Sequence, residues 1–193
     1  MVDLWFCIFI LFAGDHAMLN IILIFVAIVV IFIIVVAMQP SDFRVTRTIT
    51  TTAPASAVFA LVNDLQKWDA WSPWAKLDPK ARNSFEGPVS GTGAIMRWAG
   101  NNKVGQGSMT IIESRPDDFI RFKLEFLKPF AATNTSEFTF NSEDNQTTVT
   151  WSMYGKNNFM SKAMGLIMSC DKMVGGQFEK GLAALKSVVE AVR

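Results

Sequence analysis

Hydrophobic and polar positions follow three patterns in succession along this chain, and the first is an uninterrupted apolar run. Between Leu19 and Met38 the only polar residue is Asn20. As an α-helix the stretch 21–38 measures about 27 Å, close to the hydrocarbon thickness of a bilayer. It has no polar face of the kind that a core helix carries, and no Lys or Arg precedes it as in a signal peptide. We therefore predict a single-pass transmembrane helix over residues 19–38.

A shorter apolar patch, residues 4–13, precedes this span and is too short to cross a bilayer at about 15 Å. Residues 1–18 are either an interfacial leader, or translation begins at Met18 and residues 1–17 result from a misassigned start; both interpretations stay open. After the span come Arg44 and Arg47. Basic residues favour the cytoplasmic side, so we expect the C-terminal domain in the cytoplasm.

The second pattern is a period of two, which dominates from residue 81 onward. In the segment 118–127, for example, Ile120, Phe122, Leu124 and Phe126 alternate with charged residues. Such alternation predicts strands with one apolar face, and the hairpin-sized turns between them predict antiparallel neighbours. With a first strand near the start of the domain, seven strands are expected: 43–52, 81–86, 93–99, 103–113, 118–127, 131–140 and 146–154.

The third pattern has the helical period. Pro54 opens a short helix over 55–64, and a second helical piece carries Trp68 and Trp71. Near the C-terminus, residues spaced by three or four form one stripe: Met164, Met168, Asp171, Gly175, Phe178, Leu182, Leu185, Val189 and Val192. This stripe predicts a long helix with a kink or a close backbone approach at Gly175. We therefore expect an α+β domain over residues 43–193, with a curved antiparallel sheet of about seven strands wrapped around the C-terminal helix.

Charge and composition exclude several kinds of function. All 18 basic residues follow residue 40, and two of the 17 acidic residues precede it, so the domain carries a net charge of about +3. This is too mild for a nucleic-acid partner. The only histidine, His16, precedes the span, which excludes histidine-based triads and histidine-ligated metals in the domain. No cofactor and no metal site are expected.

Four segments give the domain a family resemblance: 53–59 (APASAVF), 71–74 (WSPW), 127–130 (LKPF) and 171–182 (DKMVGGQFEKGL). Together with the order of strand, short helices, meander and long helix, they resemble the polyketide cyclase/dehydrase group of the START-like (SRPBCC) superfamily. The resemblance covers about residues 43–192. The resemblance implies the helix-grip fold. It does not select one function, because the family includes transporters, binding proteins and cyclases.

The gap between sheet and helix predicts an apolar, ligand-sized pocket, with a hydrophobic small molecule or lipid as the partner. Aromatic and methionine side chains suit such a lining because they are apolar and adaptable, although a filled core is the alternative. Asn134 and Ser136 share the inner face of their strand and would either orient the ligand or bond to nearby backbone. The expected ligand-binding residues are Trp71, Trp74, Met96, Trp98, Phe126, Phe130, Asn134, Ser136, Trp151, Met153, Met160, Met164 and Met168.

Three functions stay open at this point. The first is binding of the apolar ligand at the membrane. The second is a cyclase or dehydratase in which Glu137 or Tyr154 handles protons, although Glu137 would need a shifted register to face inward. The third is a membrane-tethered module that binds another protein. Asp171 interrupts the apolar stripe, and we expect it to pair with a base such as Arg97 or Lys172, or else to serve as an acid at the pocket mouth.

Overall fold

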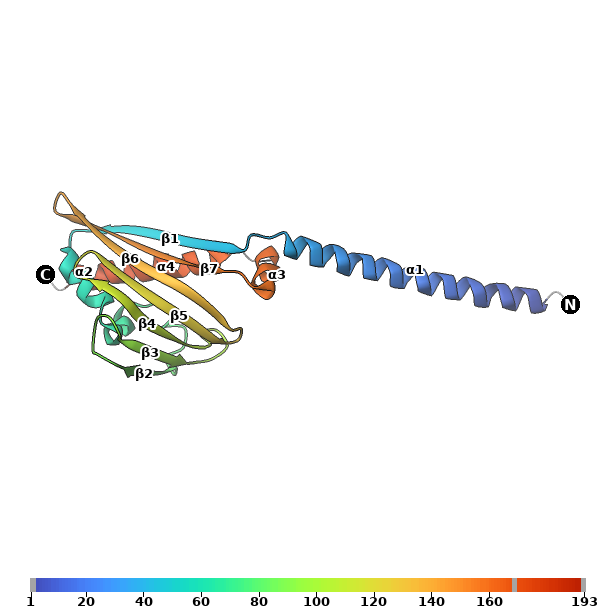
Figure 1. The fold of residues 1–193 in the computed structure, drawn as a ribbon, viewed down its shortest axis with the longest axis horizontal. Helices are drawn as coiled ribbons and strands as arrows, with labels where there is room; N and C mark the ends of the chain where they lie inside the picture. Colours follow the sequence, from blue (N-terminus) through green and yellow to red (C-terminus); the bar gives the residue numbers. More distant parts are fainter. Residues whose placement is uncertain (1–2, 168–169, 192–193) are drawn as a thin grey trace. The chain divides into compact units, whose positions relative to one another are not determined.

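The computed structural model describes residues 3–167 and 170–191, apart from the side chains of 3–16, 167 and 170. It divides into two units, residues 1–40 and 41–193. The first unit is one helix, α1 (Asp3–Ala37), so the predicted leader and the predicted span are continuous in secondary structure (Figure 1). The segment Ala17–Ala37 is long and apolar enough to cross a membrane, a property that a signal sequence shares.

The second unit is built on one seven-stranded sheet in which every neighbouring pair is antiparallel. The strand order is β1-β7-β6-β5-β4-β3-β2, so the first strand pairs with the last and the rest form a meander (Figure 1). Each predicted strand is present, with ends shifted by a few residues. The strands are β1 (Asp42–Thr51), β2 (Arg82–Glu86), β3 (Ile95–Ala99), β4 (Gln106–Arg115), β5 (Phe119–Lys128), β6 (Ala132–Glu143) and β7 (Gln146–Lys156).

Helices cover part of the inner face of the sheet. The long helix α4 (Cys170–Ala191) packs against β1 and β7, and α2 (Ala55–Val62) and η1 (Leu65–Ala70) pack beside it (Figure 1). The stripe of α4 is buried as its spacing predicts, from Phe178 to Val189. Met164, the first residue of the predicted stripe, belongs to a separate helix, α3 (Phe159–Ile167). The stripe that the sequence predicted for one helix is therefore divided between two.

Aromatic rings fill the middle of the interface between α4 and the sheet. The Phe178 ring stacks on Trp151, with 3.9 Å between ring centroids and an interplanar angle of 8°. Trp151 in turn contacts Phe138, Trp68 and Trp71, whose centroids lie 4.8, 6.1 and 5.7 Å away. These five residues are all buried. In this part of the fold the apolar side chains pack against one another as an ordinary core.

An ion-pair cluster fastens α4 to β1. Arg47 lies on the inner face of β1, and its guanidinium donates to Asp171 at 2.9 and 3.0 Å and to Glu179 at 2.6 Å. Gly175 lies one turn from each acid, and a Cβ there would collide with the Arg47 guanidinium. A close approach of backbone was one of the two alternatives expected at Gly175; what comes close there is the side chain of Arg47. The partner of Asp171 is Arg47, not Arg97 or Lys172 as expected from sequence; Arg97 pairs with Glu86.

Candidate functional site

The inner face of the sheet is only partly covered where β5 ends and β6 begins. Across that end the register aligns Asn134 with Leu124, Leu124 with Met109, and Met109 with Met96. Several apolar side chains of this concave face are only half-buried and pack against the edge of the core. With Phe126, which is half-buried beside Trp98, they form what we call the apolar cup: Met96, Trp98, Leu124 and Phe126. Trp74, also predicted as ligand-binding, is half-buried and meets Trp151 and Phe178 edge-on at the centre of the domain instead.

Local packing fixes the tryptophan at the rim of the apolar cup. Trp98 lies over Gly107 of the neighbouring strand, where a Cβ would collide with the indole ring. Its Nε1 donates to the carbonyl oxygen of Val104 at 3.2 Å, and its ring meets Phe126 edge-on at 5.8 Å. Both residues were predicted as ligand-binding. Leu124 was recognised from the period-two pattern as facing inward but was not singled out as part of the site.

One polar side chain beside the apolar cup, Asn134, which pairs with Leu124 across the strands, has a buried atom without a partner. Asn134 is 9% exposed, and its Oδ1 is buried without a hydrogen bond. The amide lies over Gly155 of β7, a position where any side chain would collide with it. A buried carbonyl oxygen without a donor is costly, by about 1–3 kcal/mol, and a ligand hydroxyl would remove that cost. The sequence alone does not identify Gly155 as the residue that makes this space.

The structure sorts the other predicted ligand-binding residues into two groups. Ser136 belongs to the core, because it accepts from Trp151 Nε1 at 2.9 Å and donates to the Ser152 carbonyl at 3.1 Å. Trp71 and Met153 are also buried in the core, and the Nε1 of Trp71 is unpartnered. A second group points to solvent: Phe130, Met160 and Met164. Met168 lies outside the described residues.

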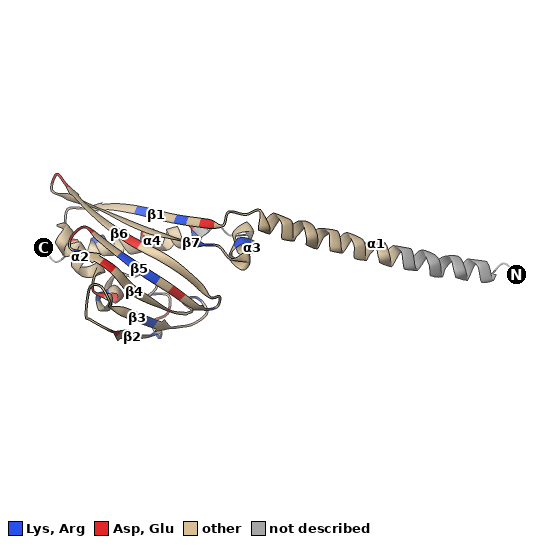
Figure 2. Cartoon of the chain, viewed as in Figure 1, with Lys and Arg blue, Asp and Glu red and all other residues tan. Residues whose placement is uncertain are grey.

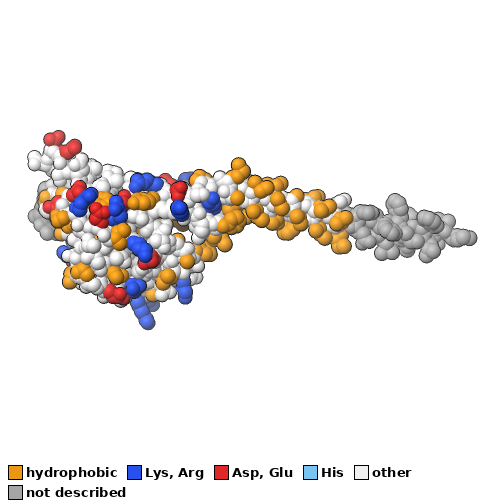
Figure 3. Space-filling view, in the orientation of Figure 1, with side chains coloured by type: hydrophobic (Ala, Val, Ile, Leu, Met, Phe, Trp, Pro, Cys, Tyr) orange, Lys and Arg blue, Asp and Glu red, His pale blue; other side chains and the backbone are white. Residues whose placement is uncertain are grey.

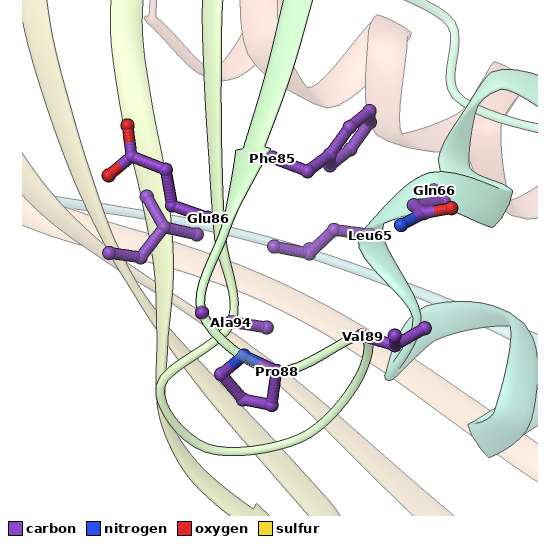
Figure 4. A pocket seen from close by; sticks show the side chains of 9 residues that line it. Leu65, Gln66, Phe85, Glu86, Pro88, Val89 and Ala94 are labelled. Carbon is purple, nitrogen blue, oxygen red and sulfur yellow. The ribbon is translucent and has the colours of Figure 1, made fainter.

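Two hollows of the domain lie away from the apolar cup, and none of the predicted ligand-binding residues lines either of them. One, of about 100 Å³, lies between η1 and the β2–β3 edge, with Leu65 and Phe85 on facing sides (Figure 4). This is well below the roughly 300 Å³ at which ligand pockets begin. The other, about 510 Å³, is an open groove beside the β6–β7 hairpin. The candidate site is therefore the open apolar cup and not an enclosed cavity.

Glu137 and Tyr154 lie together, but on the outer face of the sheet. Tyr154 Oη donates to Glu137 Oε1 at 2.8 Å, and Arg121 Nε donates to the same oxygen at 2.8 Å. Partial burial opposes ionisation of Glu137, but these two donors outweigh it and hold its pKa below the ordinary value. Burial and the hydrogen bond to Glu137 raise the pKa of Tyr154. The predicted catalytic pair is thus an ion-paired cluster on the face opposite the apolar cup.

No group of three or more His, Cys, Asp or Glu residues capable of holding a metal ion occurs in the described part of the chain. The polar chemistry of the apolar cup is limited to the Asn134 amide. Such a site can accept or donate hydrogen bonds, and its lining offers neither a base nor a nucleophile.

A seven-stranded antiparallel sheet gripping a long C-terminal helix defines the class: this is a helix-grip protein with an apolar concave face. Residues 42–190 match the family described as polyketide cyclase / dehydrase and lipid transport, and the chain belongs to that family. No curated protein matches the chain.

Solved structures agree on the fold. A Chromobacterium violaceum protein shares 14% identity over 79% of this chain and 99% of its own, with a TM-score of 0.55. The Aha1 dimer from Colwellia psychrerythraea shares 14% identity over 77% of this chain and 96% of its own, with a TM-score of 0.52. StfQ, a di-domain ARO/CYC of the steffimycin biosynthetic pathway, shares 11% over 78% of this chain, with a TM-score of 0.57; the match spans about half of StfQ, 51%.

Proposed function

We propose that this chain is a membrane-anchored protein that binds an amphiphilic small molecule or lipid in the apolar cup. The observation that carries this proposal is the unpartnered, buried Oδ1 of Asn134 among half-buried apolar side chains. Ligand sites are mostly apolar, with a few polar groups that fix orientation. Membership of a family described by lipid transport and polyketide chemistry supports a hydrophobic ligand. The apolar helix at 17–37 supports the anchor.

The chemistry of the site narrows the ligand class. An unpartnered amide oxygen calls for a hydrogen-bond donor, so the ligand carries a hydroxyl or an N–H next to its apolar body. Burial of apolar area supplies most of the affinity, at about 25 cal/mol per Å² removed from water. The hydrogen bond to Asn134 supplies the preference among ligands of similar size.

Native mass spectrometry of the full chain, released from detergent, tests the proposal, because it counts bound molecules directly. Two probes of matched shape are compared, farnesol and the same chain without its hydroxyl. One hydrogen bond contributes about 0.5–1.5 kcal/mol, so the wild type should favour the alcohol about 2–12-fold. Asn134→Leu should bind both probes equally and should fold normally, because it removes a buried polar atom that lacks a partner.

Glu137→Gln on the outer face is the matched control, and its preference should equal that of the wild type. Binding of neither probe, together with the absence of any co-purified apolar molecule, would refute the proposal. A shift in preference with Glu137→Gln and none with Asn134→Leu would place the ligand on the wrong face of the sheet. Glu137 and Tyr154 would then regain interest as functional residues.

A further inference from the structure

Helix α3 exposes its apolar side. At 100° per residue, its large apolar side chains fall within one arc of about 160°, and Ser161 and Lys162 lie outside that arc. A helix of a soluble domain normally turns such an arc toward the core. Here four residues in the arc are each 40–51% exposed: Phe159, Met160, Met164 and Leu166.

The polar side of α3 is the side that the domain holds. Asn158 caps the helix by accepting from the Ser161 backbone N–H at 2.8 Å. Lys162 Nζ donates to Ser41 Oγ at 3.1 Å, and the Asn157 N–H donates to the Ser41 carbonyl at 2.7 Å. Polar contacts thus fix the orientation of α3, and they leave its apolar arc facing outward.

The β5–β6 turn adds apolar side chains at the same end of the sheet. Leu127, next to the last residue of β5, and Phe130 in the turn are 59% and 47% exposed. β5 ends at Lys128, and β7 ends at Lys156 opposite Asp42, the first residue of β1. β5 and β7 both run antiparallel to β6, so their last residues lie at the same end of the sheet. The β5–β6 turn is therefore at the same end as α3 and Ser41, as Figure 1 shows.

Charge divides the two ends of the domain. The opposite end carries turns with four acids, one of which, Asp118, is paired with Arg115 at 2.9 Å: Asp117, Asp118, Glu143 and Asp144. Figure 2 shows the acidic tip of the β6–β7 hairpin in red and basic residues near α3, and the same tip is red in Figure 3. Asp42 and Asp78 also lie at the α3 end, where lysines outnumber them: Lys103, Lys128, Lys156 and Lys162.

We propose that α3 and the β5–β6 turn form a lipid-contacting surface that lies in the headgroup region of an anionic membrane. The occupant is a bilayer because Ser41, which holds α3, follows Met38 by three residues, and these span at most about 11 Å. Exposed apolar side chains flanked by lysines suit an anionic interface. This inference rests on the proposed anchor. It places the open end of the apolar cup against the lipid, from which the ligand would enter.

A fluorescent label tests the docking in the full chain. NBD is attached to Met164→Cys in a background with Cys7→Ser and Cys170→Ser, and the protein is reconstituted in phosphatidylcholine–phosphatidylglycerol nanodiscs. The apolar arc should lie about 5–10 Å deep, so a nitroxide near the top of the lipid acyl chains should quench most of the emission. The control is Gln146→Cys, at the far end of β7 from Lys156. That strand is about 33 Å long, so the control label should be quenched little.

Three results separate the possible explanations. Release of the protein by alkaline carbonate would refute the anchor, and equal quenching at positions 164 and 146 with the anchor intact would refute the docking. A blue-shifted label at 164 that nitroxide lipids do not quench would indicate that a protein covers α3, and it would also overturn the lipid proposal. Strong quenching at 164 together with binding of neither probe and no co-purified apolar molecule would uphold the docking while refuting the proposed ligand site.

Discussion

Removal of the Phe178 ring tests whether sheet and helix pack solidly at the centre of the domain. Phe178 is 1% exposed and stacks on Trp151 at 3.9 Å, with a second edge contact to Trp74 at 6.2 Å. A Phe→Ala change in a packed core costs about 3–5 kcal/mol, because it loses both the buried area and the contacts around the new cavity. For a domain of this size each kcal/mol lowers Tm by about 2–4 °C, so Phe178→Ala should lower it by about 6–20 °C.

Thermal unfolding in detergent, followed by near-ultraviolet circular dichroism, measures this shift through the packed aromatic rings. Phe159→Ala is the matched control, since it removes the same ring from a half-exposed position and should change the free energy of unfolding by less than about 0.5 kcal/mol. A Phe178→Ala shift no larger than that of Phe159→Ala would refute the reasoning. It would mean that α4 spans a void, as the sequence interpretation expected, and that the aromatic contacts contribute little.

The remaining predictions concern the contact between Arg47 and α4. Gly176→Ala should stabilise the helix by about 0.5–1 kcal/mol, because nothing lies within 4 Å of the new Cβ, whereas Gly175→Ala should be less stable than Gly176→Ala because it displaces the Arg47 guanidinium. In an Arg47→Met background the two alanine variants should have equal Tm values, and a difference that persists would contradict this account. The Arg47 hydrogen bond lowers the pKa of Asp171 below 3.8, so the stability it contributes is present above pH 3.8 and is lost as pH falls through the lowered pKa. Tm scans at decreasing pH should therefore show a steeper acid loss for the wild type than for Asp171→Asn, and parallel curves would contradict the assignment.

The members of the candidate site were predictable only in part, and the site lies beside the sheet–helix interface, which is filled, and not within it as the sequence predicted. Alternation alone placed Asn134 and Phe126 on the inner face, because the side chains of a strand point alternately to its two sides. Trp151 and Ser136 satisfy the same rule, yet they belong to the core. The two-residue period cannot tell a residue of the candidate site from a residue of the core. That difference depends on which other element of the fold covers each position along the strand.

Two methionines show that helical periodicity has the same limit as a predictor of site residues. Met160 and Met164 have helical spacing and were expected to face the ligand, but they face outward from α3. The sequence shows that a helix has an apolar arc, and it does not show which way the domain turns that arc. The hydrogen bond from Lys162 to Ser41, 121 residues away in sequence, is part of what decides it.

The sequence by itself determined the apolar N-terminal helix, the seven strands, their inward faces and the buried stripe of the last helix. Each of these follows from the pattern of a few neighbouring residues, so no distant contact is needed to predict it. Tertiary structure alone decided that the centre is filled, that Glu137 and Tyr154 join Arg121 on the outer face, and that Arg47 meets Asp171. Arg47 and Asp171 are 124 residues apart, and the cluster of Glu137, Tyr154 and Arg121 joins three strands. The filled centre depends on the volume left between the layers, and local periodicity carries no information about any of these.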